Sequence, residues 1–302
     1  MGCGRQVECA KRYPALRICP DCGCDLGFPI VRQAGESADA LLQRYDNAKS
    51  NCLVNIEKIQ EFEATVEQRS NVILAVPYKV LLTILNSGNA LYANYYYLID
   101  GKVRLAAQVT DHQRRIETDN RLFGAYKEEL TFCALSLSHA GVWSYGPYHL
   151  TLNINMIANR VTFTEKNTFR HQEWCDEITL SDGYKTWQER PGFRADWSTK
   201  AKLAAAKLAS KLKGETRREQ FGALLLQSDG VRDGEDYIEG HVYGSFTRQA
   251  ISHVRAPADN EFGTLVRNTP ISQLRRERKD VAAKVSALKA REGIAIDFKC
   301  GD

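Results

Sequence analysis

The stretch Asp236-Tyr-Ile-Glu-Gly-His-Val-Tyr-Gly244 carries the clearest structural pattern in the chain. Its alternation of apolar and polar residues predicts a short β-strand that ends at a glycine. Successive side chains of a strand point to opposite faces, so Glu239 and His241 share one face while Ile238 and Val242 share the other. Such a strand either exposes its polar face to water, which is the commoner arrangement, or lines a catalytic site.

The chain around this strand has the composition of a globular protein. Its 302 residues suffice for one large domain or two ordinary ones, and its 43% hydrophobic and 26% charged content is typical of such proteins. No apolar run approaches the roughly 20 residues that span a bilayer. The N-terminus lacks the apolar core of a signal peptide. We therefore expect a cytoplasmic protein with no membrane partner.

The flanking residues predict further strands and several helices. The expected strands are 131–137, 148–154, 160–165 and 221–227. The expected helices are 37–69 (one long helix or a hairpin of two), the apolar run 71–86, a basic helix from an N-cap at Ser198 to about 212, and 272–291. This pattern indicates an α+β protein whose strands lie between about 130 and 245.

Five of the nine cysteines fall within the first 24 residues, a clustering that favours a metal site over disulfides in a cytoplasmic protein. Cys19 and Cys22 form a Cys-Pro-Asp-Cys-Gly knuckle, in which the glycine lets the backbone turn. Cys3 and Cys9 are the expected second pair, and Cys24 is a spare ligand. We expect a structural Zn²⁺, whose binding would supply the folding energy of this short segment.

Basic residues are concentrated in two regions, 200–218 and 275–291, in a chain of net charge +4. Basic helices are often no more than solvated surfaces. They can equally follow a phosphate backbone, and the sequence does not decide between these alternatives.

Four segments taken in order resemble a known family. The segments are Phe132-Cys-Ala-Leu-Ser-Leu137, Val142-Trp-Ser-Tyr-Gly146, Thr164-Glu-Lys-Asn167 and Tyr237-Ile-Glu-Gly-His-Val-Tyr-Gly244. Together with the cysteine knuckle, they resemble bacterial ADP-ribosyltransferase-like proteins with an N-terminal zinc ribbon, over most of residues 17–255. Within that group the chain is most similar to the mRNA-modifying toxins of toxin–antitoxin–chaperone phage-defence operons.

This resemblance implies a fold and a domain division. The fold is a split β-sandwich of two small sheets whose cleft holds NAD as a substrate. The implied domains are a zinc ribbon at 1–30, a helical linker segment at 31–86, an ADP-ribosyltransferase-like domain at 87–262 and a basic C-terminal helical tail at 263–302.

The resemblance also implies roles for individual residues. Glu239 matches the carboxylate that holds the ribose 2′-hydroxyl and stabilises the positive charge that develops when the nicotinamide–ribose bond breaks. His241 matches a second polar residue that orients the acceptor, and an imidazole there could act as a base. Ser144, Tyr145 and Gly146 match the motif that supports the nicotinamide pocket.

The residues that bind the rest of NAD are less uniquely matched. Arg121 is the expected phosphate-binding arginine and Arg104 is its rival. Tyr92 and Asn94 are expected to line the same pocket. The segment 164–167 departs from the family pattern by a lysine, so it is either catalytic or a loop that holds strand ends through side-chain hydrogen bonds.

The leading hypothesis from the sequence is an NAD-dependent ADP-ribosyltransferase toxin of bacterial phage defence. The basic helices favour RNA or another nucleic acid as the acceptor, with a protein acceptor as the alternative. An antitoxin protein, and a chaperone in operons of this kind, are the expected partners. The competing hypotheses are a non-enzymatic zinc-containing nucleic-acid-binding protein and, with less support, a metal-dependent nuclease.

Overall fold

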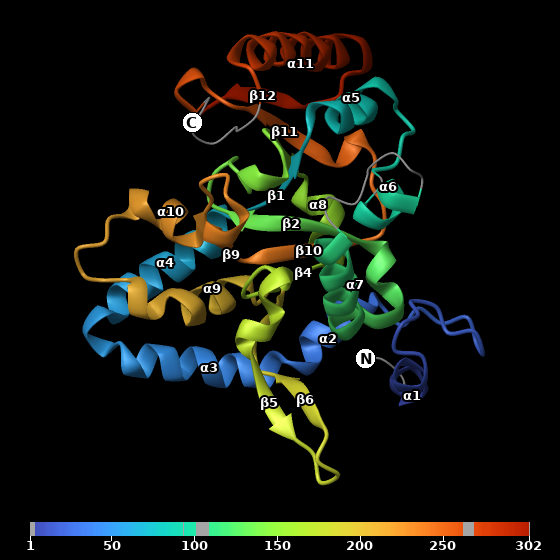
Figure 1. Ribbon diagram of the computed structural model, residues 1–302, viewed down its shortest axis with the longest axis vertical. Helices are drawn as coiled ribbons and strands as arrows, with labels where there is room; N and C mark the ends of the chain where they lie inside the picture. The colour runs from blue at the N-terminus through green and yellow to red at the C-terminus, as the bar shows by residue number, and fades with distance from the viewer. Residues whose placement is uncertain (1–3, 93, 101–108, 262–268, 302) are drawn as a thin grey trace.

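The computed structural model describes residues 4–92, 94–100, 109–261 and 269–301 (Figure 1). Two residues that the sequence analysis singled out, Cys3 and Arg104, lie outside these ranges. Within the described ranges, no helix is both long enough and apolar enough to cross a bilayer.

An eight-stranded sheet forms the centre of the structure, and every neighbouring pair is antiparallel except β11 and β12. In order across the sheet the strands are β12 (Asp297–Cys300), β11 (Ile251–Ala256), β3 (Tyr148–Leu152), β1 (Asn71–Val76), β2 (Leu130–Ser136), β10 (Glu239–Tyr243), β4 (Val161–Thr164) and β7 (Arg194–Asp196). The prediction of an α+β protein is therefore confirmed.

Strand β1 corrects the prediction that residues 71–86 form a core helix. It pairs with β2 on one side and β3 on the other. Its three consecutive residues Val72, Ile73 and Leu74 are all buried, because helices cover both faces of the sheet. A strand buried on both faces has an unbroken apolar run, which periodicity cannot distinguish from a buried helix. Pro77 ends the strand, and a helix follows it.

The same strand explains why one sheet is observed where two small sheets were expected. β1 joins the group β12-β11-β3 to the group β2-β10-β4-β7. Without it, the remaining strands would form two separate sets. The structure is thus α+β with one large, mostly antiparallel sheet.

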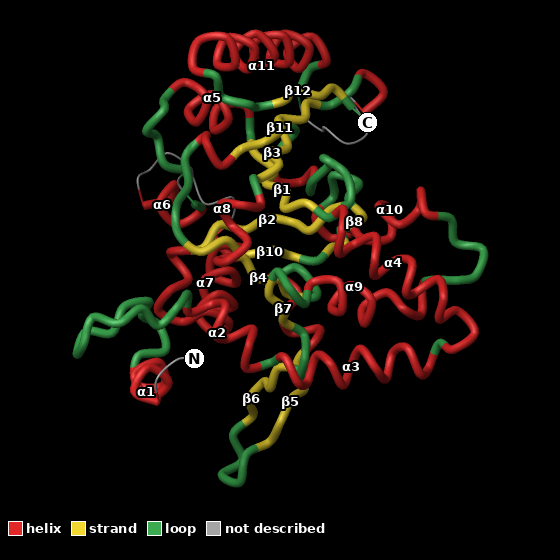
Figure 2. Tube along the Cα trace, turned by 180° about the vertical axis from the view of Figure 1, so that it is seen from behind, coloured by secondary structure: helices red, strands yellow, loops and turns green. Residues whose placement is uncertain are grey.

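Helices pack on both sides of this sheet (Figure 2). On one side, α9 contacts both α3 and α4, and on the other side lie α6 and α7. The α-helices are α1 (Gly4–Arg12), α2 (Pro29–Glu36), α3 (Ala38–Asn51), α4 (Ile56–Arg69), α5 (Tyr78–Asn86), α6 (Tyr95–Asp100), α7 (Val109–Phe123), α8 (Ile154–Ile157), α9 (Lys200–Leu208), α10 (Phe221–Leu225) and α11 (Ile271–Glu292). The region 37–69 is a hairpin of two helices, the second of the two alternatives.

Two predictions about short segments are wrong. Residues 221–227 form α10 and then the two-residue strand β8 (Leu226–Gln227), which pairs with β9 (Asp236–Tyr237). Ser198 does not cap α9, because its hydroxyl donates to Asp196 Oδ1 at 2.8 Å and the N-cap position belongs to Thr199. A two-stranded hairpin of β5 (Cys175–Thr179) and β6 (Lys185–Glu189) projects from the body of the protein (Figure 1).

The predicted basic helix near the end of the chain is α11. It lies against α5, and its apolar side joins the main core through Val281, Val285 and Leu288. After the helix the chain returns as β12 and pairs in parallel with β11.

Candidate functional site

The strand that the opening sequence predicts is present, and both of its faces are buried. Glu239 is 1% exposed and His241 is 0% exposed. β10 lies between β2 and β4, and its side chains point to the two faces of the sheet, where Phe123 of α7 covers His241 and the main core covers Val242. The rings of Phe123 and Phe132 lie 4.8 and 5.3 Å from the imidazole of His241. The polar face of this strand is therefore not solvated, and the carboxylate and imidazole belong to the interior.

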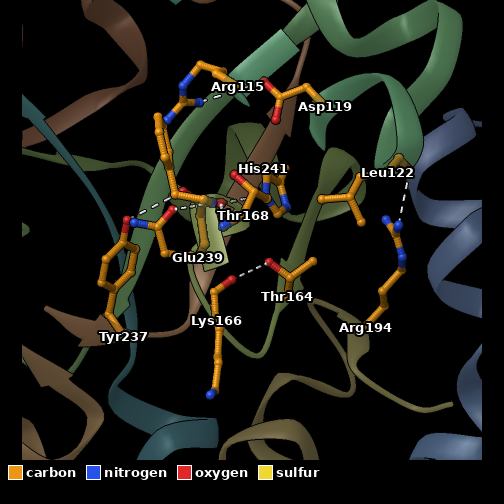
Figure 3. Close-up of polar contacts among 12 residues, drawn as sticks. Arg115, Asp119, Leu122, Thr164, Lys166, Thr168, Arg194, Tyr237, Glu239 and His241 are labelled. Carbon is orange, nitrogen blue, oxygen red and sulfur yellow. Dashed lines mark hydrogen bonds and ion pairs between the residues drawn. The ribbon is translucent and has the colours of Figure 1, made fainter. Parts of the chain in front are cut away.

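The carboxylate of Glu239 is held by three donors (Figure 3). The amide of Thr168 donates to Oε2 at 2.9 Å, His241 Nε2 lies 3.3 Å from the same oxygen, and the hydroxyl of Tyr237 donates to Oε1 at 3.4 Å. Burial alone would raise the pKa of Glu239, but the hydrogen bond from His241, the charge of Arg115 and the Thr168 amide lower it below its usual value. Glu239 is therefore ionised at neutral pH.

His241 is neutral and carries its proton toward Glu239. Burial lowers the pKa of the imidazole below its usual value, and the charges of Arg194 and Arg115 add to this effect, although the hydrogen bond to Glu239 and the charge of that carboxylate oppose it. A neutral ring that donates from Nε2 leaves Nδ1 as an acceptor, and Nδ1 has no hydrogen-bond partner among the described residues. The ring does not reach the neighbouring cavity. In this geometry His241 orients the carboxylate of Glu239 by a hydrogen bond and does not itself contact the cavity.

A cavity of about 520 Å³ opens beside Glu239, a size typical of small-molecule sites. Most of its walls are apolar or aromatic and come from β1, β2, α5 and residues 91–98. Among the described residues, its charged lining consists of one carboxylate, Glu239, and three cations, Lys79, Arg115 and Arg232. The arrangement suits a ligand that is anionic at one part and planar or apolar at another.

Arg115 of α7 is the buried cation of this cavity. Its guanidinium carbon lies 4.6 to 5.2 Å from the ring centroids of Phe169, Phe132 and Tyr95. Nη1 lies 3.7 Å from Asp119, one turn along the helix. Because aromatic faces attract cations, the three rings fix this guanidinium where it faces Glu239.

The sequence analysis chose a different arginine of the same helix. Arg121 is exposed and does not line the cavity. At 3.6 residues per turn, the six residues from Arg115 to Arg121 turn the side chain about 240° around the axis. The available signal was helical spacing, because Arg115, Asp119 and Leu122 lie on one buried face.

The turn that carries the predicted nicotinamide motif borders the cavity through one residue. Tyr145 lines the cavity, and its hydroxyl lies 3.5 Å from that of Tyr237. Ser144 instead donates its amide and its hydroxyl to Glu235, at 3.1 and 2.5 Å. Gly146 packs on the end of β1, where a Cβ would collide with the backbone of Val76. Ser144 and Gly146 therefore position the turn, and Tyr145 faces the ligand space. Glu235 was missed from the sequence.

Tyr92 and Asn94 also line the cavity, as expected. Tyr92 stacks on Phe246 with a centroid distance of 5.1 Å and an interplanar angle of 3°. The side chain of Asn94 donates to the Glu128 carbonyl and accepts from the Tyr97 amide at 3.1 Å. Both polar atoms of the Asn94 side chain are therefore used in hydrogen bonds at the start of α6.

The segment 164–167 fits the structural alternative. Thr164 donates to the carbonyl of Lys166 at 3.0 Å, and Asn167 accepts from the amide of Phe169 at 3.0 Å. These contacts shape the loop that presents the Thr168 amide to Glu239. The loop contributes a backbone donor to the site.

Four cysteines form a candidate metal centre at the N-terminus. The sulfurs of Cys9, Cys19, Cys22 and Cys24 all lie within 4.8 Å of one another. A tetrahedral Zn²⁺ with Zn–S bonds near 2.3 Å requires sulfurs about 3.8 Å apart, so the set fits this ion. Cys24, the spare candidate, therefore completes the cluster among the described residues.

The ionisation of these thiols also suits a cation. Hydrogen bonding to Cys19 raises the pKa of Cys9 to about 12, and hydrogen bonding to Cys22 raises the pKa of Cys24 to about 11. Hydrogen bonds from Cys24 lower the pKa of Cys22 to about 7. Thiols this close oppose one another's ionisation, and a bound divalent cation removes that opposition.

The backbone around the cysteines is ordered by one glycine and one arginine. Gly23 adopts φ +71°, which permits the tight turn after Cys22. Arg32, at the start of α2, donates to five main-chain carbonyls of the cysteine segment. The accepting residues are Tyr13, Pro14, Leu16, Leu26 and Gly27. The guanidinium therefore attaches the cysteine segment to the helical layer.

Three of the seven cations in the basic region 200–218 make ion pairs within the protein, whereas Lys202, Lys213, Arg217 and Arg218 make none in the described part of the chain. Lys200 is fully buried and lies 3.0 Å from Glu67. Lys207 and Lys211 both bind Asp236, at 2.5 and 3.1 Å. These lysines hold α9 to the rest of the protein and offer little to an external anion.

The basic region on α11 likewise has three paired and four unpaired cations among its described residues. Arg275 and Arg278 pair with Asp259, and Lys289 pairs with Asp297. The cations of this helix that make no ion pair in the described part of the chain are Arg276, Lys279, Lys284 and Arg291. The helix therefore presents a positive surface beside α5, which also lines the cavity.

Comparison with known protein families finds no match, and a search of curated proteins finds no significant relative.

Proposed function

We propose that this protein is an NAD-dependent ADP-ribosyltransferase that acts on a macromolecular acceptor, with RNA as the preferred class. The observation that carries the proposal is an ionised, buried carboxylate, Glu239, on the wall of a cavity with cationic and aromatic lining. Breaking a ribose–nitrogen bond develops positive charge on the ribose, and a fixed carboxylate stabilises such charge.

Each lining group has a role in this reaction. Glu239 accepts from the ribose 2′-hydroxyl and faces the developing oxocarbenium charge. Arg115 and Arg232 bind the diphosphate, and Tyr145 offers its ring to the nicotinamide. The C1′–N bond breaks with its electron pair leaving on nicotinamide. An acceptor atom then bonds to C1′ and releases its proton to solvent.

His241 acts on Glu239 in this scheme. Because the neutral imidazole donates to Oε2, it holds the carboxylate in one orientation and favours its charged form. The cysteine-bound Zn²⁺ would be structural, because its four ligands are all protein sulfurs and no position is left for a substrate.

The exposed cations of α11 support a nucleic-acid acceptor, because they lie beside a helix that borders the cavity. Lys79, on that helix, lines the cavity. A cell that makes an enzyme of this kind would need to restrain it, which is why an antitoxin partner, with a chaperone, remains part of the proposal.

The test is incubation of the full chain with labelled NAD and separate pools of RNA, DNA and protein. The parent and the exposed control Glu219→Gln should label RNA, whereas Glu239→Gln should lose at least about 100-fold of the rate. Thermal unfolding of all three proteins checks that they are folded. Equal labelling by Glu239→Gln would overturn the assignment, and labelling of the protein pool alone would replace RNA as the acceptor.

A further inference from the structure

A second carboxylate, Glu235, is buried beside the cavity and takes no part in the chemistry proposed above. It is 2% exposed and lies directly before β9. It does not line the cavity. A buried charge needs compensating contacts, so its partners indicate what it does.

Both oxygens of Glu235 accept hydrogen bonds from uncharged donors. Oε1 accepts from the Ser144 amide at 3.1 Å and from the Ser228 hydroxyl at 2.5 Å. Oε2 accepts from the Ser144 hydroxyl at 2.5 Å. The Trp143 amide in turn donates to Ser228 Oγ at 2.8 Å. The carboxylate therefore ties the turn at 143–145 to both ends of the loop 228–235.

Each of these two tied segments presents one side chain to the cavity. The turn presents Tyr145 and the loop presents Arg232. The guanidinium carbon of Arg232 lies 5.9 Å from the ring centroid of Tyr145 and 5.3 Å from that of Phe169. The relative placement of the aromatic ring and the cation thus depends on the hydrogen bonds from Ser144 and Ser228 to Glu235, which we call the Glu235 clamp.

We infer that Glu235 is a positioning residue, which holds Tyr145 and Arg232 together so that the cavity binds an anionic ligand carrying a planar group. The identity of that ligand as NAD rests on the proposed function. A glutamine at 235 keeps the shape but carries no charge, so the short hydrogen bonds from the hydroxyls of Ser144 and Ser228 lose their charge assistance, and an NH₂ group replaces one of the two accepting oxygens. Because such bonds are strong, the turn and the loop would separate.

The experiment compares five full-length proteins by calorimetric binding of NAD and, separately, of inorganic pyrophosphate. They are the parent, Glu235→Gln, Arg232→Ala and the double variant, with Glu219→Gln as the exposed control. Glu235→Gln should weaken binding of both probes about tenfold or more, and Arg232→Ala should do so by a similar factor. For pyrophosphate, which has no planar group for Tyr145, the double variant should bind no more weakly than the worse single variant, because Glu235 acts on this probe through Arg232.

The outcomes separate this inference from the proposed function. Losses of pyrophosphate affinity that multiply in the double variant, or unchanged affinity in Glu235→Gln, would overturn the positioning role, as would a parent that binds neither probe. Clamp-dependent binding of pyrophosphate without any binding of NAD would keep the inference and refute NAD as substrate. If Glu235→Gln does not fold, Ser228→Ala takes its place, since it removes one bond of the clamp and should produce a smaller loss of affinity.

Discussion

Substituting Gly240 by alanine should disturb the sheet at the point where the candidate catalytic strand enters it. Gly240 pairs with Cys133 of β2 and with Phe163 of β4. A Cβ at this position would lie 2.7 Å from Cys133 Sγ and 3.3 Å from Phe163 Cε1. Carbon atoms in good contact are about 3.5 to 4.0 Å apart, so the sulfur or the strand must move.

The magnitude follows from two opposing effects. Adding a methyl to a filled core destabilises the folded protein by about 1 to 3 kcal/mol. Replacing glycine by alanine also reduces the entropy of the unfolded chain, which stabilises the folded protein by about 0.4 to 1 kcal/mol. We expect Gly240→Ala to lower the free energy of unfolding by about 1 to 2 kcal/mol. A urea titration monitored by tryptophan fluorescence measures this loss.

A double-mutant cycle identifies the cause. Cys133→Ala removes the sulfur and should itself cost about 1 kcal/mol. In its background, Gly240→Ala should change the stability by less than about 0.5 kcal/mol, because only the milder 3.3 Å contact with Phe163 then opposes the new methyl and the lower entropy of the unfolded chain offsets it. If Gly240→Ala is as costly without the sulfur as with it, the collision described here is not the cause and the spacing of β2 and β10 is different.

Three further predictions concern ionisation, metal and charge. Burial raises the pKa of Asp119 to about 6, so its protonation stabilises the folded protein below about pH 4 and this stabilisation is lost as the pH rises to 6. The stability of the parent relative to Asp119→Asn should therefore fall by about 2 kcal/mol between pH 4 and pH 6 in urea titrations, out of about 3 kcal/mol in all, and an equal pH profile for the two proteins would contradict it. Purified protein should contain one zinc per chain by elemental analysis, and Cys9→Ser should lose it while Cys300→Ser, at an exposed cysteine, keeps it. Reversing the unpaired charges of α11 should weaken RNA binding and reduce its dependence on salt, with NAD hydrolysis unchanged, whereas a matched reversal elsewhere should leave RNA binding intact. The α11 variant carries R276E, K279E and R291E, and the control carries K202E, K213E and R218E.

The sequence predicts structure well where a residue's local pattern decides its environment. The alternation around Glu239 and His241 identifies the strand and its polar face, because successive side chains of a strand point to opposite faces of the sheet. The burial of that face depends on α7 and on the loop at Thr168, which come from elsewhere in the chain. No local pattern could have distinguished the buried face from a solvated one.

The missed elements have a shared physical origin. The sequence of β1 resembles that of a buried helix because helices cover both faces of the strand. Nothing in residues 71–76 indicates that β2 and β3 pair with them. Glu235 becomes significant only through serines 7 and 91 positions away. Arg115 was identifiable in principle, since the helical spacing of its buried neighbours was present. Cys24 was recognised as a ligand candidate, but choosing among five cysteines required the fold of the segment.

The position of β10 in the sheet has a consequence for how the chain folds. β10 fills the space between β2 and β4, two strands made far earlier in the sequence. Until it arrives, those strands face each other across a slot about 9 to 10 Å wide, with an unsatisfied hydrogen-bonding edge on each side. Closing that slot requires contacts between distant parts of the chain, which form slowly. Placing Glu239 therefore depends on contacts of high sequence separation, so the candidate site is complete only when the sheet itself is complete.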